Sequence, residues 1–464
     1  MHSPFSHGKG LFSMRLDVNR LNSTMDMTRG RPLSLLVRFG LPLMLSSILQ
    51  QLYSLCDSMV VGRLIGVEAF AAVGAASFLN WLPLSMLLGL SQGFAVVLSQ
   101  RFGAGDARGL KRSAWLSAAI GSAAAILMGA LGILFLYPLL TAMHTPAEML
   151  ELSAAYLRVV FAGLIASALY NVAATLLRAA GDSRTPLLAL AVSTLCNIAL
   201  DYILVAFANM GVEGVALATV LAQLISLAVC LARIILKPIQ TPEPSASAMT
   251  GGFTAQLLRN GLSPMFRDGV IAVGGLFVQT VVNGFGVTFV AGMTAARRYF
   301  SMMEMVGAAL EGALATFVGQ NAGANRPDRI REGTRTAVQL GVIAALLTAI
   351  LAAVFANPLI TLLIGSASPE VVQYGVTALR LTALFLPFLY LLCLYRASLQ
   401  SMGDALTPML SGFAELIMRL LSVLLLPPFI GHVAAYMADD LGWVAAAILL
   451  MTVYYQTQKR LMNQ

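Results

Sequence analysis

Gly181-Asp182-Ser183-Arg184-Thr185-Pro186 returns about 220 residues later as Gly403-Asp404-Ala405-Leu406-Thr407-Pro408. Two further pairs keep nearly the same offset and the same order: Gln100-Arg101-Phe102-Gly103-Ala104 with Gln320-Asn321-Ala322-Gly323-Ala324, and Tyr137-Pro138-Leu139-Leu140-Thr141 with Asn357-Pro358-Leu359-Ile360-Thr361. The chain therefore contains two copies of one long unit. Two such halves in a membrane commonly enclose a binding site at their interface, which is the plan of many secondary transporters.

The composition predicts an integral membrane protein. Of the 464 residues, 58% are hydrophobic and 11% are charged, whereas about 25% are charged in an ordinary soluble protein. The mean hydropathy is +0.81. A membrane-spanning helix needs about 20 mainly apolar residues. Twelve segments meet that need, six in each half: 34–60, 68–99, 113–140, 150–179, 185–208, 212–236, 255–283, 286–319, 334–363, 370–401, 406–430 and 433–457.

The formal net charge of +8 follows the topology and does not indicate a nucleic-acid partner. Basic residues crowd both tails and alternate loops: Arg15, Arg20, Arg29, Arg31, Arg101, Arg108, Lys111, Arg112, Arg178, Arg184, Arg233, Lys237, Arg326, Arg329, Arg331, Arg335, Lys459 and Arg460. The intervening loops, where Arg63 is the basic exception, carry acids and histidines: Glu68, His144, Glu148, Glu213, Glu370, His432, Asp439 and Asp440. By the positive-inside rule, this alternation predicts cytoplasmic termini and an even number of spans.

One stretch interrupts the apolar pattern. Lys237 to Gly252 is rich in proline, serine and glycine, which is typical of a linker. Because six spans precede this cytoplasmic linker, both halves start from the same side and are parallel repeats. The predicted fold is an all-α integral membrane protein with twelve transmembrane helices in two six-helix lobes around a central cavity. The predicted parts are a cytoplasmic tail (1–32), the first lobe (33–237), the linker (238–254), the second lobe (255–458) and a second cytoplasmic tail (459–464).

The repeated Gly-Asp-x-x-Thr-Pro falls at the turn between the fourth and fifth spans of each half. Glycine can end one helix, aspartate can cap the next, and proline is tolerated at a helix start, where no N–H is needed. The motif therefore predicts a structural turn. An enzyme is not expected, because the four histidines lie in the tail or at span edges without the spacing of a zinc protease: His2, His7, His144 and His432. No cofactor is expected either.

Acids inside spans mark candidate sites, because an ionisable side chain there costs roughly 2.5–3.5 kcal/mol on insertion scales. Asp57 in the first span shares a helix face with Gln50 and Tyr53. Asp201 in the fifth span follows Asn197 by one turn. A buried carboxylate pairs with a cation or takes up a proton, and neither span has a Lys or Arg near these acids. The sequence therefore predicts a proton or a sodium ion as their partner.

The second half carries a different set of charges. Glu415 and Arg419 in its fifth span are four residues apart, so that an ion pair along the helix is the simplest interpretation. Glu304 and Glu311 in its second span share one face without an adjacent base. Acids that line a central cavity would attract cationic ligands. These four residues are therefore candidates for contacts with a substrate.

The ordered set of motifs resembles the multidrug and toxic compound extrusion (MATE) family of cation-coupled efflux transporters over about residues 30 to 460. The residues that carry the resemblance are Gln51 to Asp57 with Val61-Gly62, Gln100 to Gly105, Arg178 to Asp182, Asn197 with Asp201, and Gly319 to Ala324. The branch that this chain resembles holds its proton or sodium site in the N-terminal lobe. The resemblance implies that this site consists of Asp57, Asn171, Asn197, Asp201 and Thr219, with Gln50 and Tyr53 facing the cavity of the same lobe. Without the resemblance, Asn171 and Thr219 indicate interhelical hydrogen bonds.

Another branch of the family has acids in the first and fourth spans of the second lobe. Here the first of these spans has only Asp268, near its start, and the fourth has none. The resemblance therefore does not extend to a cation site in the second lobe.

The resemblance implies a multi-pass protein of the plasma (inner) membrane that works as a monomer. Its two lobes would rock about the cavity and export small organic compounds, cationic or amphipathic, in exchange for protons or sodium. The alternative is a flippase of the same architecture for a lipid-linked or other amphipathic metabolite. Such a flippase would need a strongly cationic cavity to bind pyrophosphate, and the acids within the spans favour the exporter.

Overall fold

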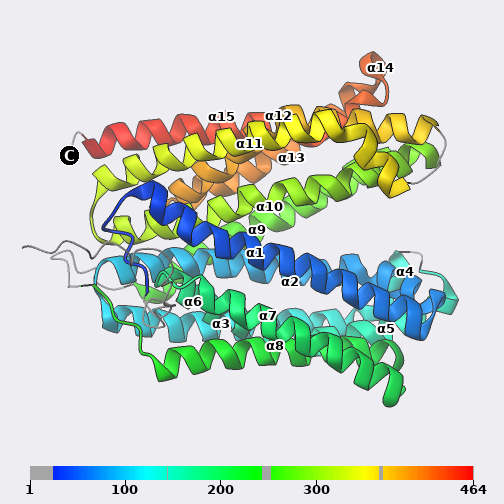
Figure 1. Cartoon of the computed structure of the whole chain (residues 1–464), viewed down its shortest axis with the longest axis horizontal. Coiled ribbons are helices and arrows are strands. Elements are labelled where there is room, and N and C mark those ends of the chain that lie inside the picture. Colours follow the sequence, from blue (N-terminus) through cyan, green and yellow to red (C-terminus); the bar gives the residue numbers. More distant parts are fainter. Residues whose placement is uncertain (1–23, 144, 243–251, 365–368, 463–464) are drawn as a thin grey trace, which may run out of the picture.

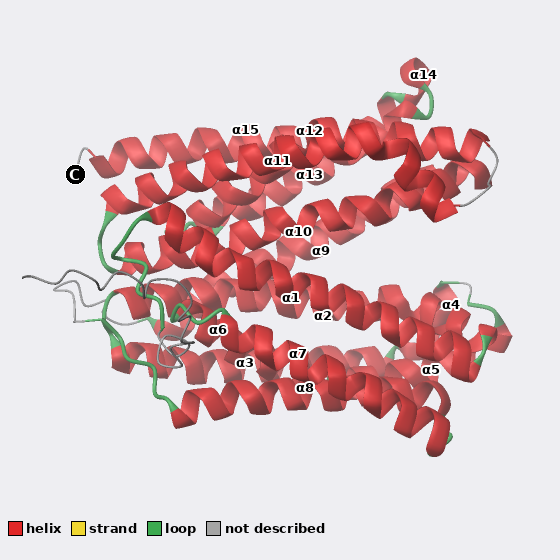
Figure 2. Ribbon diagram, viewed as in Figure 1, coloured by secondary structure: helices red, strands yellow, loops and turns green. Residues whose placement is uncertain are grey.

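Helices make up nearly all of the computed structural model, which describes residues 24–143, 145–242, 252–364 and 369–462 (Figure 2). In lipid, each backbone polar group has to bond within its own segment, and a helix achieves this. The first half contains α1 (Pro32–Val60), the π-helical η2 (Val61–Ile65), α2 (Val67–Gly103), α3 (Ala107–Leu134), α4 (Leu136–Ala142), α5 (Ala147–Ala162), α6 (Leu164–Ala179), α7 (Arg184–Asp201), the π-helical η3 (Tyr202–Phe207) and α8 (Gly211–Leu236). The second half contains α9 (Phe253–Gly284), α10 (Val287–Gly323), α11 (Pro327–Ile364), α12 (Pro369–Ser401), α13 (Leu406–Leu425), α14 (Pro427–Ile430) and α15 (Val433–Met462).

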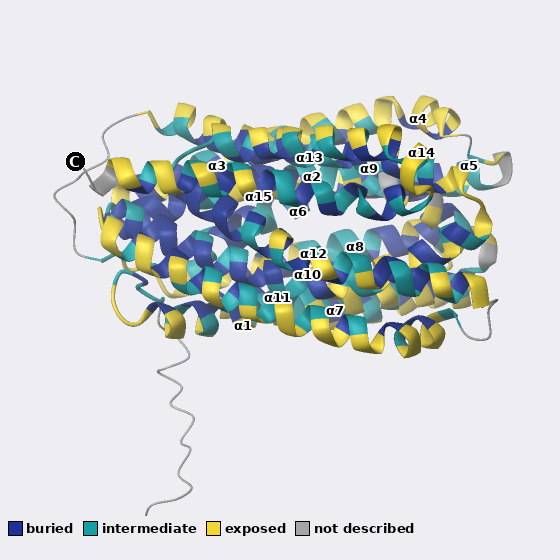
Figure 3. Ribbon diagram, turned by 90° about the horizontal axis from the view of Figure 1, so that it is seen from above, coloured by how far each residue is buried: buried dark blue, intermediate teal, exposed yellow. Residues whose placement is uncertain are grey.

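The prediction of twelve spans is confirmed once one bent pair of helices is counted as a single span. Eleven helices in the described chain are long and apolar enough to cross a membrane by themselves. The twelfth span consists of Met149–Ala162 and Leu164–Ala179, which meet at 43°. Large apolar side chains on the outside of the bundle are exposed (Figure 3), as expected for a surface in contact with lipid.

The helices gather in two groups, one from each half of the chain, and the described chain starts and ends at the same end of the bundle (Figure 1). We call this end the terminal end. There, α2 and α10 approach each other closely at equivalent glycines of the repeat. A Cβ added to Gly103 would lie 1.9 Å from the Gln320 carbonyl oxygen, and one added to Gly323 would lie 1.8 Å from the Gln100 carbonyl oxygen. Glycine is therefore required at both positions.

The two glutamines beside these glycines bond reciprocally across the halves. Gln100 Nε2 donates to the Ser401 carbonyl oxygen at 2.8 Å, and Gln320 Nε2 donates to the Ala179 carbonyl oxygen at 2.9 Å. Ser401 and Ala179 are the last residues of α12 and α6, so each glutamine satisfies a carbonyl that the helix itself leaves free. The Met27 N–H also donates to Gln320 Oε1 at 2.8 Å. This set of bonds, the glutamine lock, holds the halves together at the terminal end.

The repeated turn has the structural role that its sequence predicts. Asp182 accepts hydrogen bonds from the Thr185 N–H at 2.9 Å and the Thr185 hydroxyl at 2.7 Å. Asp404 accepts from the Thr407 N–H at 3.0 Å. Each aspartate thus caps the helix that follows it, and the motif needs no chemical function to explain it.

Several predicted boundaries were wrong. Asp439 and Asp440 were assigned to a loop, but they lie two turns inside α15. The eleventh span was extended to residue 430, but α13 ends at Leu425 because Pro427 and Pro428 start the separate short helix α14. The ninth span was started at residue 334, whereas α11 begins at Pro327 and includes several basic residues.

Candidate cation and substrate sites

The fold brings Asp57 of α1 and Asp201 of α7 together. Their carboxyl groups lie close enough to interact directly, and Thr219 of α8 lies beside both Asp57 and Tyr53. Among the described residues, neither acid forms an ion pair with a base. We call Asp57, Asp201, Thr219, Asn197 and Tyr53 the first-half cluster.

Polar atoms of this cluster are buried without a hydrogen-bond partner in the described chain. Asp201 and Asn197 have no exposed surface. Both carboxylate oxygens of Asp201, both polar atoms of the Asn197 amide, one oxygen of Asp57 and the Tyr53 hydroxyl make no hydrogen bond. Buried polar groups are nearly always paired, and an unpaired buried charge is costly. The cluster therefore offers several oxygen atoms to a small cation, and none of its own side chains carries a positive charge.

Two residues assigned to this region by the resemblance, Asn171 and Gln50, have no described hydrogen bond to the first-half cluster. Asn171 Nδ2 donates to the Ser167 carbonyl oxygen within α6 at 2.9 Å. Gln50 is exposed on α1 and does not line the cavity between the halves that is described below. Their roles in the cation site and the first-lobe cavity stay predictions.

Two π-helical segments were not predicted from the sequence. η2 begins one turn after Asp57, and η3 begins directly after Asp201. The two segments also contact each other. Single π-turns are frequent at functional sites. We found no pattern in the sequence that marks them, because a π-turn differs from an α-turn by one inserted residue.

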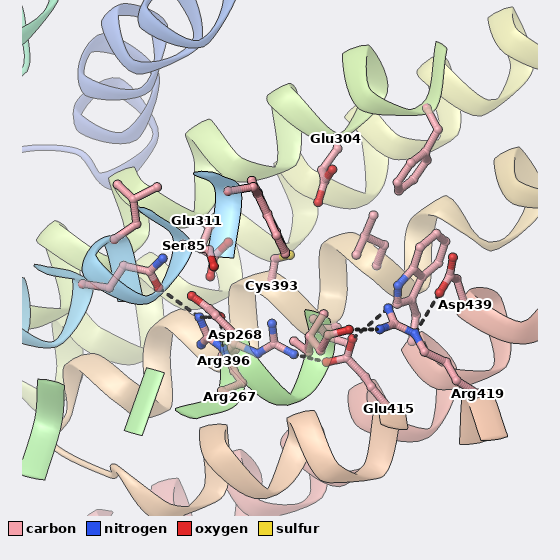
Figure 4. A pocket seen from close by; sticks show the side chains of 18 residues that line it. Ser85, Arg267, Asp268, Glu304, Glu311, Cys393, Arg396, Glu415, Arg419 and Asp439 are labelled. Atoms are coloured by element: carbon pink, nitrogen blue, oxygen red, sulfur yellow. Dashed lines mark hydrogen bonds and ion pairs between the residues drawn. The ribbon is translucent and has the colours of Figure 1, made fainter. Parts of the chain in front are cut away.

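A cavity of about 500 Å³ lies between the halves (Figure 4). It is lined by α2 from the first half and by α9, α10, α12, α13 and α15 from the second. The lining residues are Trp81, Ser85, Leu88, Gln92, Arg267, Asp268, Ile271, Phe300, Glu304, Glu311, Leu389, Leu392, Cys393, Arg396, Glu415, Arg419, Asp439 and Trp443. The four charged residues singled out in the second half are among them. Their contact with a substrate stays a prediction.

Three arginines and three acids of this cavity are paired with one another. Arg267 lies 2.8 Å from Asp268. The Arg419 Nε lies 2.7 Å from Asp439, and Arg419 Nη2 lies 3.8 Å from Glu415. Glu415 also forms a direct ion pair with Arg396 of α12. The ion pair that the sequence predicts between Glu415 and Arg419 therefore exists, but Glu415 is shared between two arginines (Figure 4).

Glu304 and Glu311 remain outside these pairs. Within the described chain neither glutamate has an ion-pair partner, and Glu304 is exposed to the cavity. The expectation that no base lies near them holds along α10 but fails in space, because Arg267 and Arg396 act electrostatically on Glu311. Since the three arginines are balanced by three acids, these two glutamates give the cavity an excess of two carboxyl groups over guanidinium groups.

The sequence assigned no role to four residues of this charged network: Arg267, Asp268, Arg396 and Asp439. Each is a charged residue inside an apolar span, which is the signal that selected the other candidates. Asp439 was missed because it was placed in a loop. Arg396 was missed because only acids were sought in its span.

Comparison with known proteins agrees with the family resemblance of the sequence. The family model MatE matches residues 42–203 and 269–425. The probable multidrug resistance protein YpnP of Bacillus subtilis (strain 168) is 31% identical over 78% of this chain and 81% of its own length. The probable multidrug resistance protein NorM of Thermotoga maritima is 23% identical over 82% of this chain and 82% of its own length. A solved outward-facing conformation of a multidrug resistance MATE family transporter of the MOP superfamily superimposes with a TM-score of 0.85 at 22% identity, covering 94% of this chain and 98% of that one. At this identity, the last likeness concerns the fold.

Proposed function

Because the chain belongs to the MatE family of membrane transporters and is not an enzyme, we propose that it couples the export of organic compounds to the entry of a proton or a sodium ion. The observation that carries this proposal is the pair Asp57 and Asp201, two interacting acids with no base beside them in the described chain. Two carboxylates close enough to interact repel each other unless a cation or a proton lies between them. Because the bound ion relieves this repulsion, binding and release of the ion can be coupled to the conformational change that exports the substrate.

The coupling ion can drive a change of conformation through the membrane potential. Moving one elementary charge through 100 mV is worth roughly 2.3 kcal/mol, which changes a two-state equilibrium well over tenfold. Asp57 and Asp201 each stand next to a π-helical segment. Loading and unloading of the pair can therefore alter the packing of α1 against α7. Both proton and sodium fit the oxygen-rich cluster, and the choice between them is left to experiment.

We place the substrate in the cavity of about 500 Å³ between the halves. Trp81, Phe300 and Trp443 offer aromatic faces, while Glu304 and Glu311 contribute unpaired carboxylates. Aromatic faces and carboxylates together suit amphipathic organic cations. A flippase for lipid-linked pyrophosphates would need free arginines, whereas the three arginines of this cavity are all engaged with acids.

Alternating access would require the two groups of helices, corresponding to the proposed lobes 33–237 and 255–458, to separate at the terminal end. We propose that this end is cytoplasmic, in a protein of the plasma membrane. Both sites lie within a single chain, which favours a functional monomer. In the present conformation the glutamine lock closes the terminal end, and transport requires it to open.

Removing the glutamine lock is expected to favour the conformation that is open at the terminal end. In Gln100→Leu combined with Gln320→Leu, the carbonyls of Ser401 and Ala179 lose their partners, and each loss costs about 1–3 kcal/mol. The equilibrium should shift about tenfold or more toward the open conformation. The measurement is the labelling rate of a cysteine introduced at the buried Ala104 by an impermeant maleimide in inside-out vesicles.

Gln279→Leu is the matched control, because this glutamine lies near the opposite end of the bundle in α9. Its labelling rate should equal that of the parent. Equal rates in the double variant and the parent would contradict the role of the lock.

The coupling ion itself is identified by transport into vesicles in which a pH gradient and a sodium gradient are imposed separately. Uptake of a fluorescent organic cation such as ethidium should follow one of the two gradients. Transport that follows neither would contradict the proposed antiport.

A further inference from the structure

Asp440 in α15 is an acid that neither site described above uses. It has no exposed surface, and neither of its carboxylate oxygens makes a hydrogen bond to any described residue. An ionised carboxylate in such a place is strongly unfavourable. Its neighbour Asp439, by contrast, lines the cavity and pairs with Arg419.

Among the described residues, no base on the helices around α15 pairs with Asp440. α12, α13, α14 and α9 pack against α15. On α13, Arg419 lies between Glu415 and Asp439. On α12, Arg380 donates to the Ala353 carbonyl oxygen of α11. Arg396 of α12 pairs with Glu415, and Arg267 of α9 pairs with Asp268. None of these arginines pairs with Asp440.

Of the remaining titratable side chains nearby, Tyr436 and Tyr454 have buried hydroxyls without a hydrogen bond in the described chain, and the others bond to groups other than Asp440. The bonds are those of Tyr374 with Glu370, Tyr390 with the Met303 carbonyl oxygen, and Tyr395 with Tyr455. His432 packs against the rings of Phe289, Tyr374 and Tyr436. The charged group that acts on Asp440 is therefore Asp439, which has the same sign.

Helix geometry directs Asp440 toward α12. Asp440, Ala447 and Tyr454 recur at intervals of seven residues and lie on one flank of α15. The Tyr454 ring is 5.1 Å from the ring of Tyr395 in α12. Both helices run toward the terminal end, so Asp440 lies at about the level of residue 381 in α12. That part of α12 contains Leu379 and Ala383, whose side chains are buried and apolar.

A small cavity of about 40 Å³ connects this level with the larger one. It is lined by Asp439, Phe300 and Trp443, which also line the larger cavity, by Ala378 and Thr382 of α12, by Tyr436 of α15, and by Met293, Ala296 and Arg297 of α10. Such a volume can hold a water molecule. The Arg297 guanidinium donates to Gln279 Oε1 at 3.0 Å. Asp440 lines neither cavity, so a proton from the larger cavity would reach it from Asp439, its neighbour in the chain.

We propose that Asp440 is a proton-binding site of the second half, loaded from the substrate cavity through Asp439. A proton from water in the cavity binds one carboxylate oxygen of Asp440 and gives the neutral acid. The same proton leaves by the same route when Asp440 ionises. A sodium ion would need several oxygen ligands, and the buried side chains of Leu379 and Ala383 at this level of α12 provide none.

Coupling of this site to the substrate rests on the function proposed above. An organic cation beside Asp439 and Glu304 would stabilise the ionised form of Asp440 and so expel its proton. The second half would then exchange a proton for the substrate in the cavity itself, while the first-half cluster binds its own coupling ion.

Infrared spectra of the purified full chain at acidic and alkaline pH test the site without reference to transport. Subtracting the Asp440→Asn spectrum from the wild-type spectrum should leave a protonated carboxyl band that disappears at alkaline pH, because the bands of other carboxyl groups, Asp57 and Asp201 included, cancel. Asp440→Glu keeps the carboxyl group and should move the band without abolishing it, which covers the case that the asparagine variant does not fold. Asp328→Asn, at an exposed site in α11, should leave the band unchanged. A difference spectrum without such a band, or a difference band that does not change with pH, would overturn the proposal.

Proton release on binding of tetraphenylphosphonium in weakly buffered solution tests the coupling. Asp440→Asn should release about one proton fewer per bound cation than the wild type. Equal release would overturn the coupling of Asp440 to the substrate. If Asp57→Asn transports normally while the infrared result stands, the proton site at Asp440 is retained and the assignment of the first-half cluster fails.

Discussion

Asp57→Asn and Asp201→Asn are each expected to abolish gradient-driven efflux of ethidium while leaving the protein correctly inserted. Each substitution keeps the size of the side chain but removes one negative charge from an interacting pair. The carboxylate that remains no longer repels a second one, so the pair loses the repulsion that a proton or a sodium ion relieves. If no ion is exchanged, the membrane potential does no work on the transporter. The roughly 2.3 kcal/mol that one charge gains through 100 mV then no longer drives the conformational change.

The measurement is efflux from inside-out vesicles with an imposed gradient, at matched expression levels. Asp328→Asn serves as control, because it also removes a carboxylate. Asp328 is exposed, and its carboxylate lies 3.5 Å from the exposed guanidinium of Arg326. Binding of ethidium without a gradient should persist in both cluster variants. Transport at the wild-type rate in either variant would refute its role as a coupling residue.

Glu304→Gln combined with Glu311→Gln is expected to weaken binding of organic cations by about 100-fold. A charge-assisted contact is worth about 1.5–3 kcal/mol, and Glu304 contributes at the lower end because it is exposed and screened. The double substitution also leaves the three arginines of the cavity in balance with three acids, so that the excess of carboxyl groups is gone. Each single substitution should cost about tenfold.

Equilibrium binding of tetraphenylphosphonium and of a neutral ligand of similar size separates charge from packing. The neutral ligand should bind the double variant as well as it binds the wild type. Glu332→Gln, on an exposed part of α11 outside the cavity, should change neither affinity. An equal loss for both ligands would indicate that the cavity has collapsed, and unchanged cation binding would place the substrate elsewhere.

The fold was largely predictable, because a membrane imposes simple requirements on a sequence. Length and hydropathy located all twelve spans, including the stretch 150–179 that proves to be bent at Gly163. Errors arose where local chemistry changes an end. Pro427 and Pro428 separate α14 from α13, and the acids at positions 439 and 440 suggested a loop although α15 already contains them.

The candidate sites were only partly predictable. Asp57 and Asp201 were selected because ionisable residues are costly in apolar spans, and the structure brings these two acids together. Asn197 was selected because it shares a helix face with Asp201, and Thr219 only through the family resemblance. Glu304 and Glu311 were selected for the same reason as the two aspartates, but the arginines near Glu311 come from other helices. A pattern along one helix cannot report the charge of its neighbours.

The sequence by itself determined the class, the repeat and the list of costly residues, since all three depend on composition and on spacing along the chain. The tertiary structure decided which of those residues are partners. It balanced three arginines against three acids in the cavity and joined the repeated motifs through Gln100 and Gln320. Within the described chain it left Glu304, Glu311 and Asp440 without an ion-pair partner. Electrostatic energy depends on distance in space and on burial, and both are set by how the helices pack.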